Sequence, residues 1–245
     1  SSSVAPNDDP TLLFTNAGMN QFKSIFLNKE NPKFLRAVNS QKCIRVSGKH
    51  NDLEEVGIDL FHHTFFEMLG NWSFGDYYKE EAIKWTWELF TEIWELDKSR
   101  LWVSVYYKDE EAFQIWKNST DIQENRIVKC KEEDNFWEMG NTGPCGPCSE
   151  VHYYVGDEVD NQIADGVNNS DQYWELGNIV FIQYNRINDK SLVDLTSKHI
   201  DTGFGLERIS AILQGKNSNY DTDLFYPVIK EVESISNVPY ADNGV

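Results

Sequence analysis

The segment His199-Ile-Asp-Thr-Gly-Phe-Gly-Leu-Glu-Arg208 places an acid, two glycines and an arginine close together. Its glycines permit a close approach of the backbone to a ligand. The apolar pattern of residues 209–214 predicts a helix, and a loop that enters a helix offers free N–H groups to an anion. Arg208 adds a planar guanidinium for phosphate, while Asp201 could hold a cation. Taken alone, the segment is equally consistent with an ordinary glycine-rich helix start.

The composition indicates a folded, acidic chain. Of its 245 residues, 40% are hydrophobic and 13% aromatic, which permits a sizeable core. A formal net charge of −18 excludes nucleic-acid binding through a general electrostatic field, so such contacts must be local or come from another part of the protein. The chain has neither a signal peptide nor an apolar run of about 18 residues, so no membrane association is predicted. Four cysteines are too few for a disulfide scaffold, and we expect a reducing, cytoplasmic setting.

The pattern of apolar residues predicts strands with few helical crossovers between them. We expect strands at residues 11–15, 41–46, 62–69, 101–107, 126–131 and 173–184, with 192–195 paired to the last. Helices are expected at residues 78–96, 109–117 and 221–232. This order favours an α+β fold with an antiparallel sheet over a doubly wound parallel one, and no glycine-rich nucleotide motif of the parallel folds is present. Residues 156–171 are polar and acidic, and we predict a surface insertion there.

Arg45 in the second predicted strand and a pair of histidines in the third are candidate ligand contacts. Arg45 lies at the end of its strand and could hold a phosphate with two hydrogen bonds, although a surface arginine is the simpler interpretation. His62 and His63 are adjacent in a predicted strand, so they should face opposite sides. We therefore expect one packed and one ligand-facing histidine. No Cys or His spacing completes a zinc site around them.

The segment Cys145-Gly-Pro-Cys148 has the spacing of a thiol–disulfide oxidoreductase motif. That motif should begin a helix after a strand, whereas here Thr142-Gly-Pro precedes it and a strand is predicted to follow. A zinc site that includes His152 lacks a fourth ligand. We interpret the segment as a rigid loop whose path is fixed by its Gly and Pro residues, with Trp137 as a flat wall of a nearby pocket.

Long segments in order along the chain resemble the catalytic domain of the alanyl-tRNA synthetases, a family of class II aminoacyl-tRNA synthetases. These segments are residues 9–22, 41–45, 48–53, 62–70, 134–140, 142–148, 201–208 and 217–225. The resemblance implies a class II synthetase-like antiparallel sheet flanked by helices, with the family's three motifs at residues 9–22, 41–74 and 201–214. It also implies one catalytic domain over residues 1–245, truncated at both ends, with the tRNA-binding and editing regions elsewhere.

The same resemblance implies a reaction and a site. The expected reaction activates L-alanine with ATP to alanyl-adenylate and pyrophosphate, and the full-length protein then transfers alanine to the 3′ end of tRNA(Ala), which it binds mainly through other regions. Mg²⁺ should accompany ATP, with Glu175 as a candidate ligand, and no zinc is expected. The ATP-binding residues would be Arg45, His63, Trp137, Leu176, Gly177, Asn178, Gly205 and Arg208, with Arg45 and Arg208 catalytic. The alanine-binding residues would be Trp137, Asn178, Val180, Asp201 and Gly203.

One position departs from the pattern of the family. The family usually has Trp before the residue that corresponds to Asn178, whereas this chain has Gly177. A backbone contact to the nucleotide would survive this change, but a contact through the indole would not. The alternative hypothesis is therefore a class II-like paralogue that binds nucleotide without charging tRNA.

Overall fold

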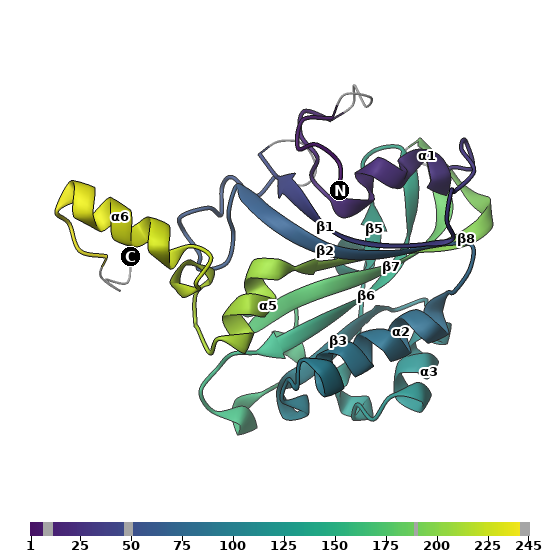
Figure 1. Ribbon diagram of the computed structural model, residues 1–245. Coiled ribbons are helices and arrows are strands. Elements are labelled where there is room, and N and C mark those ends of the chain that lie inside the picture. Colours follow the sequence, from purple (N-terminus) through teal and green to yellow (C-terminus); the bar gives the residue numbers. More distant parts are fainter. Residues whose placement is uncertain (7–11, 47–50, 189–190, 241–245) are drawn as a thin grey trace.

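A sheet of eight strands organises the computed structural model, which describes residues 1–6, 12–46, 51–188 and 191–240 (Figure 1). The strand order is β1-β2-β8-β7-β6-β3-β4, with β5 paired to β6 beside that path. The pairs are antiparallel, apart from the parallel pair of β3 with β4. The strands are β1 (Arg36–Ile44), β2 (Phe65–Phe74), β3 (Leu101–Tyr106), β4 (Ile127–Cys130), β5 (Phe136–Glu138), β6 (Gly143–Tyr154), β7 (Tyr173–Asn188) and β8 (Ser191–Gly205). The predicted α+β class is confirmed.

The helices that flank the sheet are short. The α-helices are α1 (Lys23–Phe26), α2 (Lys79–Glu88), α3 (Glu110–Ser119), α4 (Glu132–Asn135), α5 (Leu206–Leu213) and α6 (Tyr226–Ser236). The 3-10 segments are η1 (Gly18–Phe22), η3 (Lys98–Arg100), η4 (Glu124–Arg126), η5 (Val159–Asn161), η6 (Ala164–Gly166) and η7 (Asn219–Asp221), and η2 (Leu89–Ile93) is a π-helical extension of α2. No helix in the four ranges named above has both the length and the apolar character needed to span a membrane.

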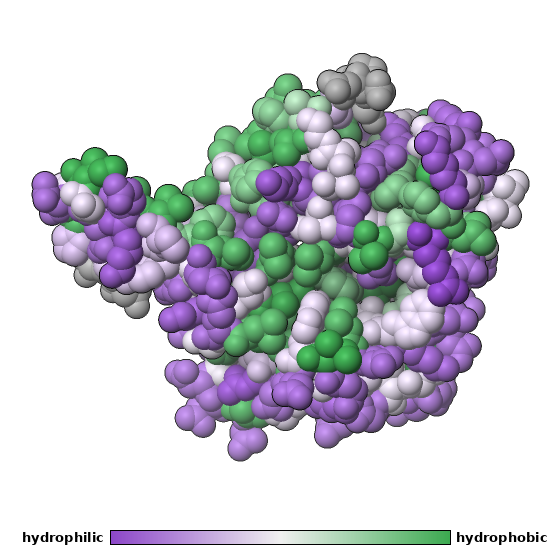
Figure 2. All heavy atoms as spheres, viewed as in Figure 1, coloured by the Kyte–Doolittle hydropathy of each residue, from purple (hydrophilic) through white to green (hydrophobic). Residues whose placement is uncertain are grey.

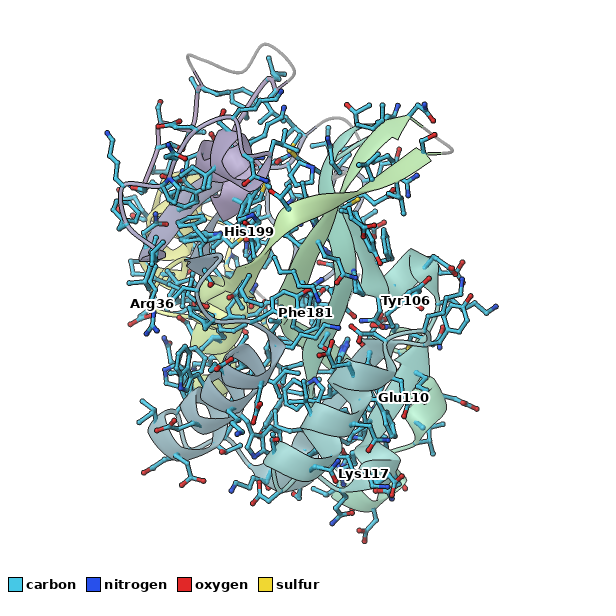
Figure 3. The ribbon with its side chains drawn as sticks, turned by 90° about the vertical axis from the view of Figure 1, so that its right-hand side faces the viewer. Arg36, Tyr106, Glu110, Lys117, Phe181 and His199 are labelled. Carbon is cyan, nitrogen blue, oxygen red and sulfur yellow. The ribbon has the colours of Figure 1, made fainter. Side chains whose placement is uncertain are left out.

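Helices α2 and α3 cover one face of the sheet and enclose the larger apolar core (Figure 1). Ile83, Trp87 and Phe90 recur at helical spacing along α2 and η2 and are buried. They pack in the same core as Phe181 of β7, which lies above these helices in Figure 3. Burial of each such side chain stabilises the fold by about 2 kcal/mol relative to exposure. This face is filled with side chains and holds the sheet in place.

The opposite face carries a smaller apolar core at one end, formed where η1 and α1 pack over β2. Phe22 packs against Trp72, and Phe26 packs against Phe74. The Trp72 ring lies over Gly70, where an added Cβ would come within 2.2 Å of the ring. Glycine is therefore required at position 70 for Trp72 to lie flat on the sheet. Beside this core, the same face is open.

Local signals set where two of the helices begin. The Asp109 side chain accepts a hydrogen bond from the backbone N–H of Ala112, a cap worth about 1 kcal/mol to α3. The final helix was expected at 221–232 but begins at Tyr226, because Pro227 occupies its first turn and the residues before it form η7. The other predicted helices are confirmed with small shifts of their ends.

Two predicted strands differ from the structure near the N-terminal motifs. Residues 12–15 form no strand, because Thr15 makes single backbone hydrogen bonds to Val4 and Ile44 instead of a ladder. The strand expected at 62–69 begins only at Phe65, so both histidines before it lie in a loop. Residues 7–11 and 47–50, which include parts of the predicted motifs 1 and 2, lie outside the described residues.

Two segments expected to be loops are strands. Cys145–Cys148 lies within β6, between β5 and β7, and residues 199–205 belong to β8, between β2 and β7. Glycine and proline normally disfavour strands, but here each segment has a partner strand on both sides, which outweighs the local preference. The predicted pairing of residues 192–195 with β7 is confirmed.

The connections outside the sheet include two exposed regions. Residues 156–171 link β6 to β7 through η5 and η6, and most of their side chains are exposed, although Val167 is buried against Trp102 and Tyr173. α6 stands away from the sheet and has no buried residue. Polar and apolar side chains are both exposed on it (Figure 2).

Candidate active site

A cavity of about 800 Å³ opens on the face of the sheet that α2 and α3 leave uncovered. Every site residue predicted from the sequence lines this cavity. These residues are Arg45, His63, Trp137, Glu175, Leu176, Gly177, Asn178, Val180, Asp201, Gly203, Gly205 and Arg208. The structure therefore brings together side chains from four separate parts of the chain, while the ligand of each remains a prediction.

The first row of side chains across the cavity floor is largely apolar with one acid in it. The strand registers place Trp72, Asp201, Val180 and Cys148 side by side on β2, β8, β7 and β6. Trp72, Val180 and Cys148 belong to one buried apolar cluster, against which Trp137 also packs. Asp201 is thus an acidic group in an apolar wall.

The second row lies two residues further along each strand. It has glycines at one end and polar side chains at the other. It runs Gly70, Gly203, Asn178, Glu150 and Ser104. The two glycines have no side chains of their own, and neighbouring side chains occupy the space above them: the Trp72 ring lies over Gly70, and Met68 lies over Gly203. The three polar side chains on the other side form a hydrogen-bonded group.

An irregularity in β7 adds Glu175 to the same face. Gly177 pairs with Val151 of β6, but Glu175 pairs with His152, so Leu176 is an extra residue in the ladder. Such a bulge reverses the alternation of side chains. Glu175, Asn178 and Val180 consequently all line the cavity.

Asp201 is a buried acid on the cavity floor with a strongly perturbed pKa. It is 7% exposed, and Trp72 Nε1 donates a hydrogen bond of 2.7 Å to its Oδ1. Burial raises the pKa of this carboxyl to about 7, against the lowering effect of the Trp72 hydrogen bond. A ligand cation beside Asp201 would favour the ionised form, so the group suits an ammonium.

The cationic end of the cavity contains two arginines that leave neighbouring segments. Arg45 Nε donates to the carbonyl oxygen of Asn16 at 3.0 Å, and the guanidinium lies 5.2 Å from the centre of the Phe66 ring. Arg208 is carried by α5, and Glu207 beside it ties that helix to β2 by accepting a hydrogen bond from the backbone N–H of Glu67.

The Arg208 side chain is held by contacts on several sides. Its guanidinium donates to the carbonyl oxygen of Glu175 at 2.9 Å and lies 3.2 Å from His62 Nε2 and 4.8 Å from the Phe61 ring centre. Asp201 and Gly205, the residue before α5, lie four positions apart on β8, which is about 13 Å along an extended strand. We call the part of the cavity around Asp201 the acidic end and the part around Arg45 and Arg208, which also contains Glu175 and Glu207, the basic end. The backbone span between them is about the length of a small ligand.

The two adjacent histidines have different surroundings. His63 is buried, accepts a hydrogen bond of 3.1 Å from Asn219 at Nε2, and packs against Tyr220. Burial, with Arg208 nearby, lowers its pKa to about 4. His62 instead joins Asp59 to Arg208. His63, the predicted nucleotide contact, is the packed histidine, and His62 meets the cavity-lining Arg208. Both belong to a loop rather than a strand, and a ligand contact of either residue stays a prediction.

Glu175 presents a carboxylate to the cavity and is a candidate cation ligand. Its side chain is 41% exposed, and one oxygen lies 3.9 Å from Arg208. Burial and the nearby Glu150 raise the pKa of Glu175, while Arg208 opposes the shift. Mg²⁺ is usually held by one or two carboxylates together with substrate phosphates. Among the residues that the structure describes, no cluster of three or more His, Cys, Asp or Glu side chains could hold a metal alone.

The two cysteines of the Cys145–Cys148 segment are buried and reduced. Burial and the neighbouring Glu150 raise the pKa of the Cys148 thiol well above its ordinary value. A redox-active cysteine needs the opposite shift and exposure. The structure therefore gives no support to the oxidoreductase interpretation, and Cys148 is part of an apolar wall.

A side chain at position 177 would point away from the cavity. A Cβ added there would lie 2.0 Å from Phe204 Cδ1 and 2.9 Å from the carbonyl oxygen of Gly203, on the face covered by helices. A side chain at this position could not reach the cavity directly. With Gly177 in place of the family's usual Trp, the residue still lines the cavity. The predicted backbone contact to the nucleotide is therefore compatible with the change.

Several cavity residues were not predicted from the sequence. His62, Glu150, Met68 and Glu207 all line the cavity. The proximity of His62 to the predicted His63 was a usable signal. Glu150 gave no comparable signal, because its position depends on the register between β6 and β7.

An antiparallel sheet with a cavity that combines a buried acid, arginines and glycines fits a class of enzymes that bind an amino acid and a nucleotide together. The family model for tRNA synthetases class II (A) matches residues 1–245, and the chain belongs to this family. The relatives that it resembles are alanine–tRNA ligases. It is 59% identical over 241 residues to the alanine–tRNA ligase of Chlorobium chlorochromatii, a match that covers 98% of this chain and 27% of the relative.

A eukaryotic relative gives a similar result. The chain is 53% identical to the cytoplasmic alanine–tRNA ligase of Dictyostelium discoideum, covering 100% of this chain and 27% of that protein. The family expected from the sequence motifs is confirmed. The chain spans about a quarter of the length of these curated relatives.

Proposed function

We propose that this chain activates L-alanine with ATP, forming alanyl-adenylate and pyrophosphate, and that the complete enzyme then transfers alanine to the 3′ end of tRNA(Ala). The observation that carries the proposal is the buried Asp201 at one end of a cavity that has Arg45 and Arg208 at the other. An amino acid and a triphosphate present the matching charges. The names of the most similar relatives support the same substrates.

Positioning and charge neutralisation would account for catalysis. An oxygen of the alanine carboxylate forms a bond to the α-phosphorus while the bond from that phosphorus to the bridging oxygen breaks, and pyrophosphate leaves. Two anions must approach each other, and Arg45 and Arg208 would offset their charge. No general base is required, because the carboxylate is already ionised at neutral pH. Mg²⁺ bound to the phosphates would neutralise further charge, and Glu175 would hold it.

The apolar row explains which side chain of the amino acid fits. With the ammonium at Asp201, the substrate methyl group would contact Val180, Cys148 and Trp137. A small apolar pocket excludes large side chains but discriminates weakly between similar ones, by about 1–3 kcal/mol for one methylene. We therefore expect activation of glycine and serine at lower efficiency than alanine.

The transfer step involves surfaces beyond the cavity. With a net charge of −18, this chain offers little general attraction for tRNA, so we assign most tRNA contacts to other regions of the longer protein. We propose a cytoplasmic location, in agreement with the name of the Dictyostelium relative.

Alanine-dependent exchange of labelled pyrophosphate into ATP tests the proposal. We expect the chain to catalyse this exchange with alanine, and Arg45→Ala to abolish it, because the α-phosphate would lose its partner. Arg36→Ala is the matched control, since Arg36 is an exposed arginine that does not line the cavity. Exchange that is independent of alanine, or that persists in Arg45→Ala, would contradict the proposal.

A further inference from the structure

The cavity floor contains a hydrogen-bonded group that the proposed chemistry does not use. Glu150, Ser104 and Asn135 are 7%, 0% and 0% exposed, and they connect to Asn178 at the cavity. Ser104 Oγ lies 2.9 Å from Glu150 Oε2, and Asn135 Nδ2 donates to Ser104 Oγ at 2.9 Å. A buried carboxylate in this setting requires hydrogen-bond donors.

Most donors and acceptors in this group follow from its chemistry. Asn135 donates to the Ser104 oxygen, so the Ser104 hydrogen is available for Glu150 Oε2 at 2.9 Å or His152 Nε2 at 3.3 Å, and the shorter contact favours Glu150. Asn178 Nδ2 lies 3.4 Å from Glu150 Oε1 and must be the donor, because an ionised carboxylate only accepts. His152 Nε2 lies 3.3 Å from Glu150 Oε2 on the far side. Glu150 therefore receives donors from its neighbours and orients each of them.

This arrangement leaves the oxygen of the Asn178 amide without a partner. With its nitrogen turned to Glu150, Asn178 Oδ1 is buried and has no hydrogen-bond partner. A buried acceptor left in this state destabilises the empty site. The strand registers place Asn178 opposite Gly203, one step along from the pair Val180 and Asp201. Two acceptor groups thus lie on either side of Gly203, over which the flexible Met68 side chain packs. This arrangement suits a ligand with several N–H donors on one atom.

We infer that Glu150 is a positioning residue for recognition of the substrate ammonium. It holds the Asn178 amide with the nitrogen towards Glu150, which leaves the covered, unpartnered Asn178 Oδ1 as an acceptor. Once the ligand displaces the side chains that cover this oxygen, Asn178 Oδ1 and the Asp201 carboxylate accept hydrogen bonds from the same ammonium. This inference rests on the proposed amino-acid activation and adds a residue to it. Glu150 touches Asn178 rather than the substrate, so its effect is on amino-acid binding and not on the nucleotide.

The variant Glu150→Gln tests this assignment without changing the size of the side chain. Ser104 would still donate to the oxygen of the introduced glutamine, which leaves the amide nitrogen of that glutamine facing Asn178. That nitrogen donates, so the Asn178 amide turns over and presents its own nitrogen to the ammonium. We expect KM for alanine in pyrophosphate exchange to rise at least about tenfold, as for loss of a hydrogen bond to a charged group, with KM for ATP unchanged.

A second substitution should reverse the defect. In the double variant Glu150→Gln/Asn178→Asp, the introduced aspartate accepts from the introduced glutamine with one oxygen and offers the other to the ammonium. We expect KM for alanine to return towards the wild-type value. Asn178→Asp alone should be impaired, because it places two carboxylates side by side. Glu133→Gln is the matched control at an exposed carboxylate of the cavity rim.

The possible outcomes are distinct. If KM for alanine in Glu150→Gln equals that of wild type, rises together with KM for ATP, or is not improved by Asn178→Asp, the inference is wrong. If Glu150→Gln does not fold, as judged by thermal unfolding, Glu150→Asp replaces it. The shorter side chain draws the carboxylate away from Asn178 Nδ2, which already lies 3.4 Å from it, and a rise in KM for alanine alone is again expected. Absence of alanine-dependent exchange in the wild-type chain would instead contradict the proposed function itself.

Discussion

The two ends of the cavity are built in different ways. At the acidic end, Asp201, Asn178 and Val180 lie on central strands with a paired strand on each side. At the basic end, Arg45 follows β1 and Arg208 extends from α5, and each is oriented by side-chain contacts rather than by a ladder. The difference indicates that strand pairing on both sides fixes the acidic end, which we call the rigid end, whereas contacts of the side chains themselves hold the two arginines at the basic end.

The largest expected effect is at the rigid end. Asp201→Asn keeps an oxygen that can accept from Trp72 Nε1 but removes the charge that would pair with an ammonium. Breaking one partner of a buried ion pair costs about 3–5 kcal/mol, so KM for alanine should rise by about 1,000-fold. KM for ATP should change little. Equal rises in the two constants, measured by pyrophosphate exchange, would remove the distinction between the ends.

The same substitution should also change how stability depends on pH. Because the pKa of Asp201 is raised from 3.8 to about 7, the folded chain binds a proton more tightly than the unfolded chain. The destabilisation caused by its charge grows as pH rises from 3.8 and is complete above pH 7. Asp201→Asn lacks this effect, so its stability relative to wild type should increase by about 2–3 kcal/mol between about pH 5 and pH 8. Urea unfolding at both pH values measures it, and a constant difference would be the contrary result.

A smaller effect is expected at the basic end. Arg208→Lys keeps the charge but cannot contact the Glu175 carbonyl oxygen, His62 and the Phe61 ring through one planar group. We expect KM for ATP to rise by about 10- to 100-fold, with KM for alanine affected less. Arg36→Lys serves as the control at an arginine outside the cavity. If Arg208→Lys matches wild type, charge alone is sufficient at this end.

The smallest functional effect is expected from a change on the helix-covered face of the sheet, behind the cavity floor. Gly177→Ala places a methyl group against Phe204 and should destabilise the fold by about 1–3 kcal/mol. It should leave KM for alanine and for ATP close to wild type, because the new group points away from the cavity. Gly140→Ala is the control, since an added Cβ meets nothing within 4 Å there. Thermal unfolding and pyrophosphate exchange on the same samples separate stability from binding.

The sequence predicted which residues line the cavity better than it predicted their secondary structure. Short motifs of functional side chains identified Arg45 and Asp201, and the resemblance to the family identified Asn178. The glycines at 203 and 205 suggested a turn, and only pairing with strands distant in sequence makes that segment a strand. Local preference carries no information about such partners.

Contacts that depend on register were beyond prediction for a related reason. Glu150 meets Asn178 and Ser104 because β6 pairs with β7 and β3 in one particular alignment. These residues are 28 and 46 positions from Glu150 in the chain. Nothing in the local pattern around Glu150 distinguishes it from an ordinary strand carboxylate.

The extra residue in β7 has a consequence for how this site tolerates changes in chain length. Without Leu176, regular alternation would turn either Glu175 or the pair Asn178 and Val180 to the helix-covered face. A candidate cation ligand and the proposed amino-acid-binding residues would then no longer share one space. Deletions and insertions between Glu175 and Asn178 should therefore be far less acceptable than substitutions of Leu176 by other apolar residues, since the number of residues there decides which half of the site exists.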